Sequence, residues 1–401
     1  MQPAARFATA ENQGVPVARA GEFAPLALGT LSIWPPVVLA PMAGVTNLPF
    51  RSLCREYGAG LYVSEMITAR AWILGNRRTL LLASSAEHES PRSVQIYGSD
   101  PRDVGEMARG LAGAGVDHID LNFGCPVPKV TRLGGGSAIP LKPRLLARIL
   151  RAAVKSAAPL PVTIKVRKGI DEGLVTCFDA GRVAQEEGAA AIGLHARTAA
   201  QLYSGDADWN AIGELKARLS IPVLGNGDVW ECWDALRMLR ETRCDGVIVG
   251  RGCLGRPWLF RELAQVFEGT EPEVPPSLGA ILALMEEHAR RLIAFFGERE
   301  GMLHMRKWCG WYTKGFAGSA AVRAALARID TLEDMRRELA RLDPAERFPL
   351  SALRAHRAKG SRSQRVALPE GYLEQRDDDT PPRSAHAAEE LAAWESTLSG
   401  G

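Results

Sequence analysis

The stretch that decides the fold is 222-PVLGNGDVWECWDALRMLRETRCDGVIVGRGC-253. It begins with an apolar run at 222–225, continues with an amphipathic segment at 231–240, and ends in a second apolar run at 246–249. Short apolar runs bounded by Gly, Asn and Asp are typical of buried strands, and apolar residues three and four positions apart are typical of helices. The stretch therefore predicts a strand, a crossover helix and a second, parallel strand.

The same alternation extends outward in both directions from about residue 37. Eight apolar runs are predicted as strands, at 37–40, 61–64, 93–97, 118–121, 162–166, 190–194, 222–225 and 246–249. Helix-like segments separate them, at 48–57, 103–114, 143–157, 175–187, 211–219 and 231–240. Eight strand–helix repeats in about 235 residues predict a (β/α)8 TIM barrel of the α/β class, with a doubly wound sheet as the alternative.

Composition changes on both sides of the predicted barrel. A linker rich in Pro and Glu at 268–277 is followed by helix formers to about residue 356, which predicts a smaller all-helical C-terminal domain. The expected organisation is a flexible N-terminal extension at 1–32, the barrel at 33–268, the helical domain at 269–357 and a mostly disordered tail at 358–401.

Overall composition excludes several classes of protein. The 401 residues are 46% hydrophobic and 24% charged with a net charge of +3, which excludes disordered and collagen-like chains. The seven cysteines form no C-x-x-C pair, so the usual zinc and iron–sulfur signatures are missing. We expect free thiols, no metal, no membrane span and a cytoplasmic location.

Polar residues follow the predicted strands, where a TIM barrel carries its active-site loops. They are Pro41-Met42, Glu65, Gln95, Asn122, Cys125, Lys165, Arg167, His195, Arg197, Asn226, Asp228 and Gly250-Arg251. Barrels commonly bind phosphate through the loops after the last two strands, so Asn226-Gly227-Asp228 and Gly250-Arg251 predict a phosphorylated ligand. A pair of tight turns is the simpler alternative.

Two side chains at this rim carry distinctive chemistry. Lys165 lies among apolar strand residues, and a buried lysine needs an anionic partner. It suits either Schiff-base chemistry or charge stabilisation of a bound ring. Cys125 lies in a turn fixed by Gly124 and Pro126, and a thiol with an ordinary pKa near 8.5 is protonated at neutral pH. Cys125 is therefore better suited to act as a general acid than as a nucleophile, although most lone cysteines are structural.

The helical segment is basic. Residues 288–360 contain fifteen Lys or Arg and eight Asp or Glu, a net charge of +7. Arg306, Lys307 and Lys314 alternate with Trp308, Trp311 and Tyr312 at spacings that can share a helix face. This pattern is compatible with a nucleic-acid surface and also with an ordinary solvated helix.

These residues together resemble the tRNA-dihydrouridine synthases, and in particular their bacterial B subgroup. The matching motifs lie in order between about residues 33 and 320: 39-LAPMAGVT-46 with Phe50-Arg51, 64-SEM-66, 95-QIYG-98, 122-NFGCP-126 with Gly136-Ser137, 165-KVRKG-169, 195-HART-198, 226-NGD-228, 250-GRG-252 and 255-GRPW-258. Such an ordered series makes a chance match very improbable.

The resemblance implies roles for individual residues. FMN contacts would come from Pro41, Met42, Ala43, Gln95, Lys165, His195, Asn226, Gly227, Asp228, Gly250 and Arg251, the last five at its phosphate. Cys125 would be the catalytic proton donor, and Asn122 and Arg197 would contact the substrate, with Arg306, Lys307 and Lys314 on the RNA. NADPH would supply electrons and tRNA would be the partner; no protein partner is implied.

Some features depart from the family pattern, and other activities stay open. Pro128 stands where a basic residue is common before Lys129, and 134-GGG-136 makes the following loop looser. One alternative is an FMN barrel that acts on a free pyrimidine, against which the basic helical segment argues. A non-catalytic RNA-binding barrel and an aldolase that uses Lys165 are two others. The sequence predicts neither the uridine position nor the oligomeric state.

Overall fold

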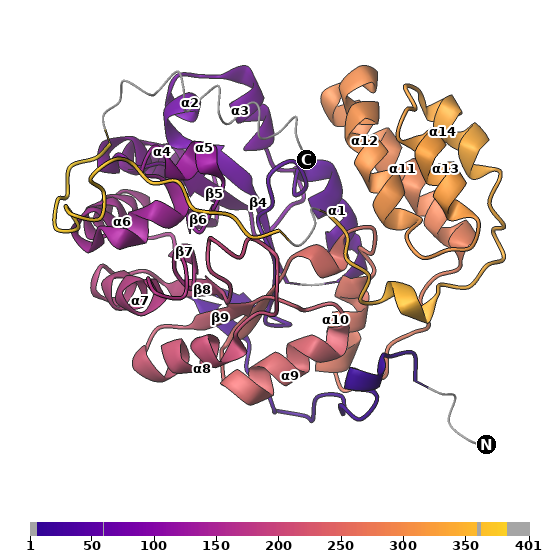
Figure 1. Ribbon diagram of the computed structural model, residues 1–401, viewed down its shortest axis with the longest axis horizontal. Helices are drawn as coiled ribbons and strands as arrows, with labels where there is room; N and C mark the ends of the chain where they lie inside the picture. The colour runs from indigo at the N-terminus through magenta and orange to yellow at the C-terminus, as the bar shows by residue number, and fades with distance from the viewer. Residues whose placement is uncertain (1–5, 59, 359–361, 383–401) are drawn as a thin grey trace.

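The chain forms a closed eight-stranded parallel barrel with a helical unit at one side (Figure 1). The computed structural model describes residues 6–58, 60–358 and 362–382. The barrel strands are β3 (Val37–Leu39), β4 (Leu61–Thr68), β5 (Ser93–Tyr97), β6 (His118–Phe123), β7 (Val162–Arg167), β8 (Ala191–His195), β9 (Val223–Asn226) and β10 (Gly246–Val249). Each strand pairs in parallel with the next, and β10 closes the barrel on β3. The predicted TIM barrel is confirmed.

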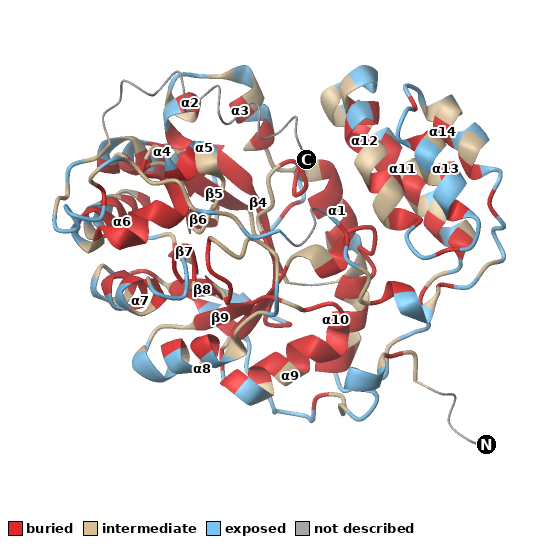
Figure 2. Cartoon of the chain, in the orientation of Figure 1, coloured by how far each residue is buried: buried red, intermediate tan, exposed pale blue. Residues whose placement is uncertain are grey.

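Helices surround the barrel or lie in the loops at its carboxyl end. They are α1 (Leu48–Tyr57), α2 (Ala69–Ile73), α3 (Arg77–Leu82), α4 (Pro101–Gly113), α5 (Pro128–Thr131), α6 (Pro143–Ala157), α7 (Cys177–Glu186), α8 (Trp209–Arg218), α9 (Cys232–Thr242) and α10 (Leu259–Phe267). Two short 3-10 helices, η2 (Gly136–Leu141) and η3 (Arg251–Cys253), lie in loops that follow β6 and β10. Figure 2 shows that these helices bury their inner faces and expose their outer ones.

The C-terminal unit consists of α11 (Leu278–Phe296), α12 (Glu298–Tyr312), α13 (Ser319–Leu326) and α14 (Leu332–Leu339), with η4 (Leu350–Ala352) after them. Ser277 begins α11, since its hydroxyl accepts a hydrogen bond from the Ala280 amide at 3.4 Å. The unit packs on α1, where Phe50 contacts Trp308 and His288 with ring centroids 4.3 and 5.7 Å apart. It therefore lies beside the barrel wall.

The N-terminal segment differs from the flexible extension that the sequence predicts. Strands β1 (Leu26–Leu28) and β2 (Leu31–Ile33) form an antiparallel hairpin. Leu26, Leu28 and Ile33 are buried against inward-facing strand residues such as Val38 and Leu224. The hairpin thereby closes the amino-terminal end of the barrel, and burial of these apolar side chains fixes residues that composition alone marks as loose.

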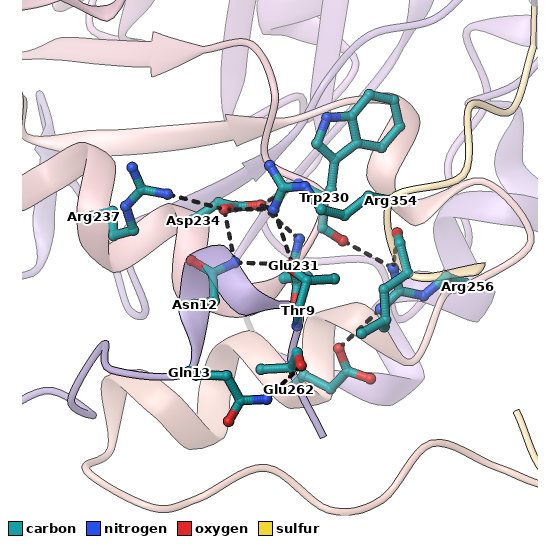
Figure 3. Close-up of polar contacts among 12 residues, drawn as sticks. Thr9, Asn12, Gln13, Trp230, Glu231, Asp234, Arg237, Arg256, Glu262 and Arg354 are labelled. Atoms are coloured by element: carbon teal, nitrogen blue, oxygen red, sulfur yellow. Dashed lines mark hydrogen bonds and ion pairs between the residues drawn. The ribbon is translucent and has the colours of Figure 1, made fainter. Parts of the chain in front are cut away.

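The first part of the segment, around η1 (Ala10–Asn12), is held by a polar network (Figure 3). Thr9 and Asn12 donate hydrogen bonds to Glu231, and Asn12 also donates to Asp234 at 2.9 Å. Arg354, from beyond the helical unit, forms ion pairs with the same two carboxylates at 2.9 and 3.0 Å. The network ties both flanks of the chain to the start of α9.

The C-terminal tail also differs from its predicted disorder over the part that the structure describes. Residues 362–382, drawn in yellow in Figure 1, run along the barrel past α6 and β6. Tyr372 is buried there against Ala138, Leu141 and Ile170. The composition of the tail is polar, but its few apolar residues cover loops that would otherwise be exposed. The predicted tail spans 358–401. Of this range, the structure describes Ala358 and residues 362–382, and the other residues lie outside the described part of the chain.

Candidate active site

An open cleft lies at the carboxyl ends of β3, β7, β8, β9 and β10. It is lined by Ala40, Pro41, Met42, Lys165, His195, Arg197, Tyr203, Asn226, Gly227, Asp228, Val229, Trp230, Ile248, Gly250, Arg251 and Gly252. The structure thus brings most of the predicted cofactor residues together with Arg197. Ala43 and Gln95 do not line the cleft.

Arg197 and Asp228 form an ion pair at one side of the cleft. Arg197 Nη2 lies 2.9 and 2.8 Å from the two carboxylate oxygens of Asp228, and its Nε donates to the Ser204 carbonyl at 3.2 Å. Its Nη1 is buried and has no hydrogen-bond partner among the described residues. A buried charged donor without a partner is costly, so this atom marks a place where a ligand acceptor fits.

Arg251 adds a second positive charge to the same wall. Its guanidinium lies 4.8 Å from the ring centre of Tyr203 and 4.9 Å from that of Trp230, and 3.6 Å from an Asp228 oxygen. Burial and the charge of Arg197 both lower its pKa. A Cβ added to Gly250 would meet no atom closer than Ala40 Cβ, at 3.8 Å, so this glycine leaves space in the cleft. This wall of the cleft therefore carries two arginine side chains and, at Gly250, a stretch of backbone that a ligand can approach.

The side chain of Asp228 is not available to a phosphate. Besides Arg197, its carboxylate accepts a hydrogen bond from the Ala207 amide at 2.7 Å. Asp228 has φ +57° and follows Gly227 with φ +133°, where an added Cβ would lie 2.5 Å from Ala207 Cβ. The turn therefore needs glycine at 227, and the Asp228 carboxylate orients Arg197. Only backbone atoms of Asp228 remain to contact an anion.

Lys165 and His195 face the cleft from the middle of the barrel. Burial, together with repulsion from Arg167, lowers the pKa of Lys165 from 10.5 to about 8, while Asp120 partly offsets this. Burial also raises the pKa of Asp120 to about 6. The pKa of His195 is lowered well below 6.5 by burial and by the charges of four cations, so its imidazole is neutral at pH 7. No hydrogen bond to Lys165 Nζ is found in the described part of the chain.

Gln95 and Asn122 form a chain of hydrogen bonds beneath the loop that follows β6. Gln95 Nε2 donates to Asp120 Oδ2 at 2.6 Å, and Asn122 Nδ2 donates to Gln95 Oε1 at 2.9 Å. Asn122 Oδ1 accepts from the amides of Gly124 and Cys125 at 3.1 and 3.0 Å. In this state both side-chain amides are engaged with the protein, and Asn122 fixes the start of the Cys125 loop.

Cys125 lies in this loop. Its side chain is partly exposed, whereas the other six cysteines are buried. Partial removal from water raises the pKa of its thiol, so the thiol is protonated at neutral pH. Its carbonyl accepts from the Ser137 amide at 3.0 Å. A protonated thiol can donate a proton, whereas a nucleophile would need the thiolate.

Arg167 is a residue whose role sequence reasoning missed. Its Nε donates to the Gly124 carbonyl at 3.0 Å, and its Nη1 donates to the Thr198 and Leu202 carbonyls at 2.9 and 2.8 Å. It therefore ties the Cys125 loop to the loop after β8. The period of a β-strand could have indicated this role. Arg167 follows Lys165 by two positions, so the two side chains point to the same side of the strand.

The three basic residues expected to contact RNA have different surroundings. Arg306 donates to the Ile329 carbonyl at 2.8 Å and pairs with Asp330 at 2.6 Å. Lys307 Nζ donates to the Gly44 carbonyl at 2.7 Å, next to the cleft, whereas Lys314 is exposed. Arg306 and Lys307 are thus engaged within the protein in this state.

The expectation of a surface that mixes basic and aromatic residues on α12 is wrong for Trp308 and Tyr312. Trp308 and Tyr312 are fully buried against α11 and α1. They hold the helical unit on the barrel and offer no surface on which a base can stack. The same helix spacing that places aromatic residues on one face serves a core as readily as a binding surface.

The described residues contain neither a metal-binding cluster nor a membrane-spanning helix. No group of three or more His, Cys, Asp or Glu side chains there is placed to hold a metal ion. No helix within those ranges has the length and apolar character needed to cross a membrane.

Comparison with known proteins gives a consistent result. The family described as dihydrouridine synthase (Dus) matches residues 38–348. A probable tRNA-dihydrouridine synthase of Mycobacterium tuberculosis is 50% identical over 373 residues, which cover 90% of this chain and 96% of that protein. One of Mycobacterium leprae is 47% identical, covering 88% and 99%. The tRNA-dihydrouridine synthase B of Xanthomonas axonopodis is 42% identical over 304 residues, covering 76% of this chain and 91% of that protein.

Proposed function

The chain belongs to the dihydrouridine synthase family, and from this premise we propose that it reduces the C5=C6 double bond of uridines in tRNA. It does so with FMN as hydride carrier, NADPH as electron donor and Cys125 as proton donor. The family membership carries the choice of reaction and substrate. The cleft at the carboxyl end of the barrel supports the choice of cofactor.

The observation that carries the cofactor assignment is a surplus of buried positive charge. Four cations, Lys165, Arg167, Arg197 and Arg251, lower the pKa of His195. Among the described residues, the carboxylates that act on Lys165, Arg197 and Arg251 are those of Asp120 and Asp228. Concentrated charge of one sign in a partly buried cleft is stabilised by a ligand of the opposite sign. FMN fits, because it carries a phosphate at one end and a ring that gains electrons at the other.

Different residues of this chain would contact different parts of the cofactor. Arg197 Nη1 and Arg251 would hold the phosphate, with Asp228 keeping Arg197 in place. Lys165 would stabilise negative charge on the ring, and the neutral His195 would offer one ring nitrogen as donor or acceptor. Pro41 and Met42 would form the floor of the cleft. When bound, FMN supplies a hydride from NADPH to C6 of uracil.

Cys125 completes the addition across the double bond. Its protonated thiol gives a proton to C5, the thiolate is protonated again by solvent, and the net change is one hydride and one proton added to the base. A uridine must leave its stack to reach this cleft, so the RNA needs a binding surface beside the barrel. The helical unit lies beside the barrel, and its exposed Lys314 would contact RNA phosphates.

A single cuvette experiment tests this function. The purified protein is loaded with FMN, reduced anaerobically with NADPH, and mixed with tRNA that lacks dihydrouridine. We expect the flavin absorbance to bleach with NADPH and to return on addition of tRNA, with a mass gain of two hydrogens per modified uridine. A protein that takes up no FMN would contradict the cofactor assignment.

The same experiment separates the main alternative. An enzyme for free pyrimidines would be reoxidised by uracil or a related base and not by tRNA. Reoxidation by tRNA alone would exclude that activity.

A further inference from the structure

We propose that the C-terminal strap, residues 362–382, positions the Cys125 loop, and that Gln364 is the positioning residue that does so. The inference goes beyond the family reaction, because the strap lies outside the matched residues 38–348. It rests on the proposed function only where it gives the Cys125 thiol a catalytic role.

Gln364 joins the strap to two loops at the catalytic end of the barrel. Its Nε2 donates to the carbonyl of Pro126, the residue after Cys125, at 2.8 Å and to the carbonyl of Ala199 at 3.2 Å. Its own amide donates to the Ala200 carbonyl at 2.8 Å. One side chain therefore bridges the loop after β6 and the loop after β8, beside the thiol.

The strap also holds the far end of the same loop. Tyr372 Oη donates to the Gly134 carbonyl at 3.2 Å, and its buried ring packs on Leu141. The loop between Pro126 and Gly134 is thus fixed at both ends by contacts from the strap. It ends at the first glycine of 134-GGG-136, the run that the sequence marks as loose.

Charged contacts anchor the strap itself. Asp378 accepts a hydrogen bond from Lys142 Nζ at 2.9 Å, and the same ammonium lies 4.6 Å from the ring centre of Tyr372. Asp379 pairs with Arg148 on α6 at 3.2 Å. The strap is therefore attached at α6 on the barrel wall, while Gln364 reaches the loops that follow β6 and β8.

The length shared with relatives differs from one relative to another. The match to the Mycobacterium tuberculosis protein covers 90% of this chain, more than residues 33–357 alone supply, whereas that to the Xanthomonas axonopodis protein covers 76%. Part of the mycobacterial match therefore lies in the N-terminal segment or in the tail.

The test compares full-length, FMN-loaded Gln364→Ala with wild type and with Gln375→Ala. Gln375 is an exposed residue of the same strap for which the structure gives no side-chain hydrogen bond, so it is the matched control. The first readout is alkylation by iodoacetamide, which reports on Cys125 because the other six cysteines are buried. Cys125→Ala supplies the background.

Loss of the two Gln364 side-chain hydrogen bonds predicts alkylation about three- to tenfold faster, with Gln375→Ala unchanged. The second readout is reoxidation by saturating tRNA, which we expect to slow about tenfold while tRNA affinity and bleaching by NADPH stay unchanged. Alkylation equal to that of the control would overturn the proposal. So would weaker tRNA binding with unchanged alkylation, since the strap would then contact RNA. If wild type does not reduce tRNA, the proposed function fails, and alkylation still decides the role of the strap.

Discussion

The two ends of the barrel are built by the same strands but carry different chemistry. At the amino-terminal end, Leu26 and Leu28 of the β1–β2 hairpin pack on inward-facing Val38 and Leu224. At the carboxyl end, Lys165 and Arg197 leave charged groups without a full set of partners. The polar and apolar groups of one end are satisfied by the chain itself, and we propose that a ligand completes the other. The difference separates residues that stabilise the fold from residues that serve the reaction.

The largest effect is expected from Cys125→Ala, which removes the proposed proton donor at the carboxyl end. We expect reoxidation by tRNA to slow about a hundredfold to ten-thousandfold, the usual range for loss of a general acid. FMN uptake and bleaching by NADPH are expected to be unchanged, because Cys125 does not line the cleft. Stopped-flow absorbance measures both steps. Reoxidation at the wild-type rate would remove Cys125 from the mechanism.

Leu28→Ala tests the opposite end. Leu28 is 1% exposed, so truncation should lower the free energy of unfolding by about 2–4 kcal/mol through lost burial and a cavity. Denaturant unfolding measures this change, with the exposed Ser32→Ala of the same hairpin as control. FMN affinity and tRNA reduction below the unfolding midpoint should match wild type. A large loss of FMN affinity would show that the two ends are coupled.

Lys165→Met is expected to stabilise the protein without FMN while impairing the reaction. Burial lowers the pKa of Lys165 from 10.5 to about 8, so at pH 7 the folded state holds a charge that it disfavours. We expect a gain of about 1–2 kcal/mol at pH 7, discounted for the partial exposure of the side chain. Between pH 8 and 10.5 the lysine loses its proton on folding, wild-type stability rises, and the gain shrinks.

Thermal unfolding of the two proteins at pH 7 and pH 9.5 measures this pH dependence. If the stability difference between Lys165→Met and wild type were the same at both pH values, the Lys165 ammonium would already be paired in the folded protein. Slower reduction of tRNA by the more stable variant would show that Lys165 is retained for the reaction.

The smallest effect is expected at the helical unit, with Lys314→Ala. Loss of one phosphate contact predicts tRNA affinity about two- to threefold weaker and a salt dependence reduced by about one unit of slope. Arg306→Ala is the comparison, because Arg306 already pairs with Asp330. Filter binding at several salt concentrations measures both. A larger effect at Arg306 would place the RNA on its side of α12.

The barrel and the composition of its catalytic rim could be read from the sequence. The strand at 162–167 alternates apolar and polar residues, so Thr163, Lys165 and Arg167 share one side of the strand, and Lys165 lines the cleft. The sequence could not indicate which charged side chains pair with each other and which remain available to a ligand. Asp228 was expected at a phosphate, but its carboxylate binds Arg197, a pairing between loops 31 positions apart.

The flanking segments were harder to interpret for two physical reasons. The β1–β2 hairpin has strands of three residues, too short to show a period, and it folds because the barrel end buries it. The strap is held by hydrogen bonds to backbone carbonyls of distant loops and by ion pairs with Lys142 and Arg148, and these contacts leave no pattern in composition. In α12, the face that carries Trp308 serves the core, although its spacing is equally compatible with a surface.

The most direct test of the claim that a ligand completes the carboxyl end is an equilibrium titration of the cofactor-free protein with FMN and with riboflavin. The two molecules differ by the phosphate that Arg197 and Arg251 would hold. We expect FMN to bind about a hundredfold more tightly, as the loss of charged hydrogen bonds from a buried arginine implies. Equal affinities, or no binding of either molecule, would contradict the account.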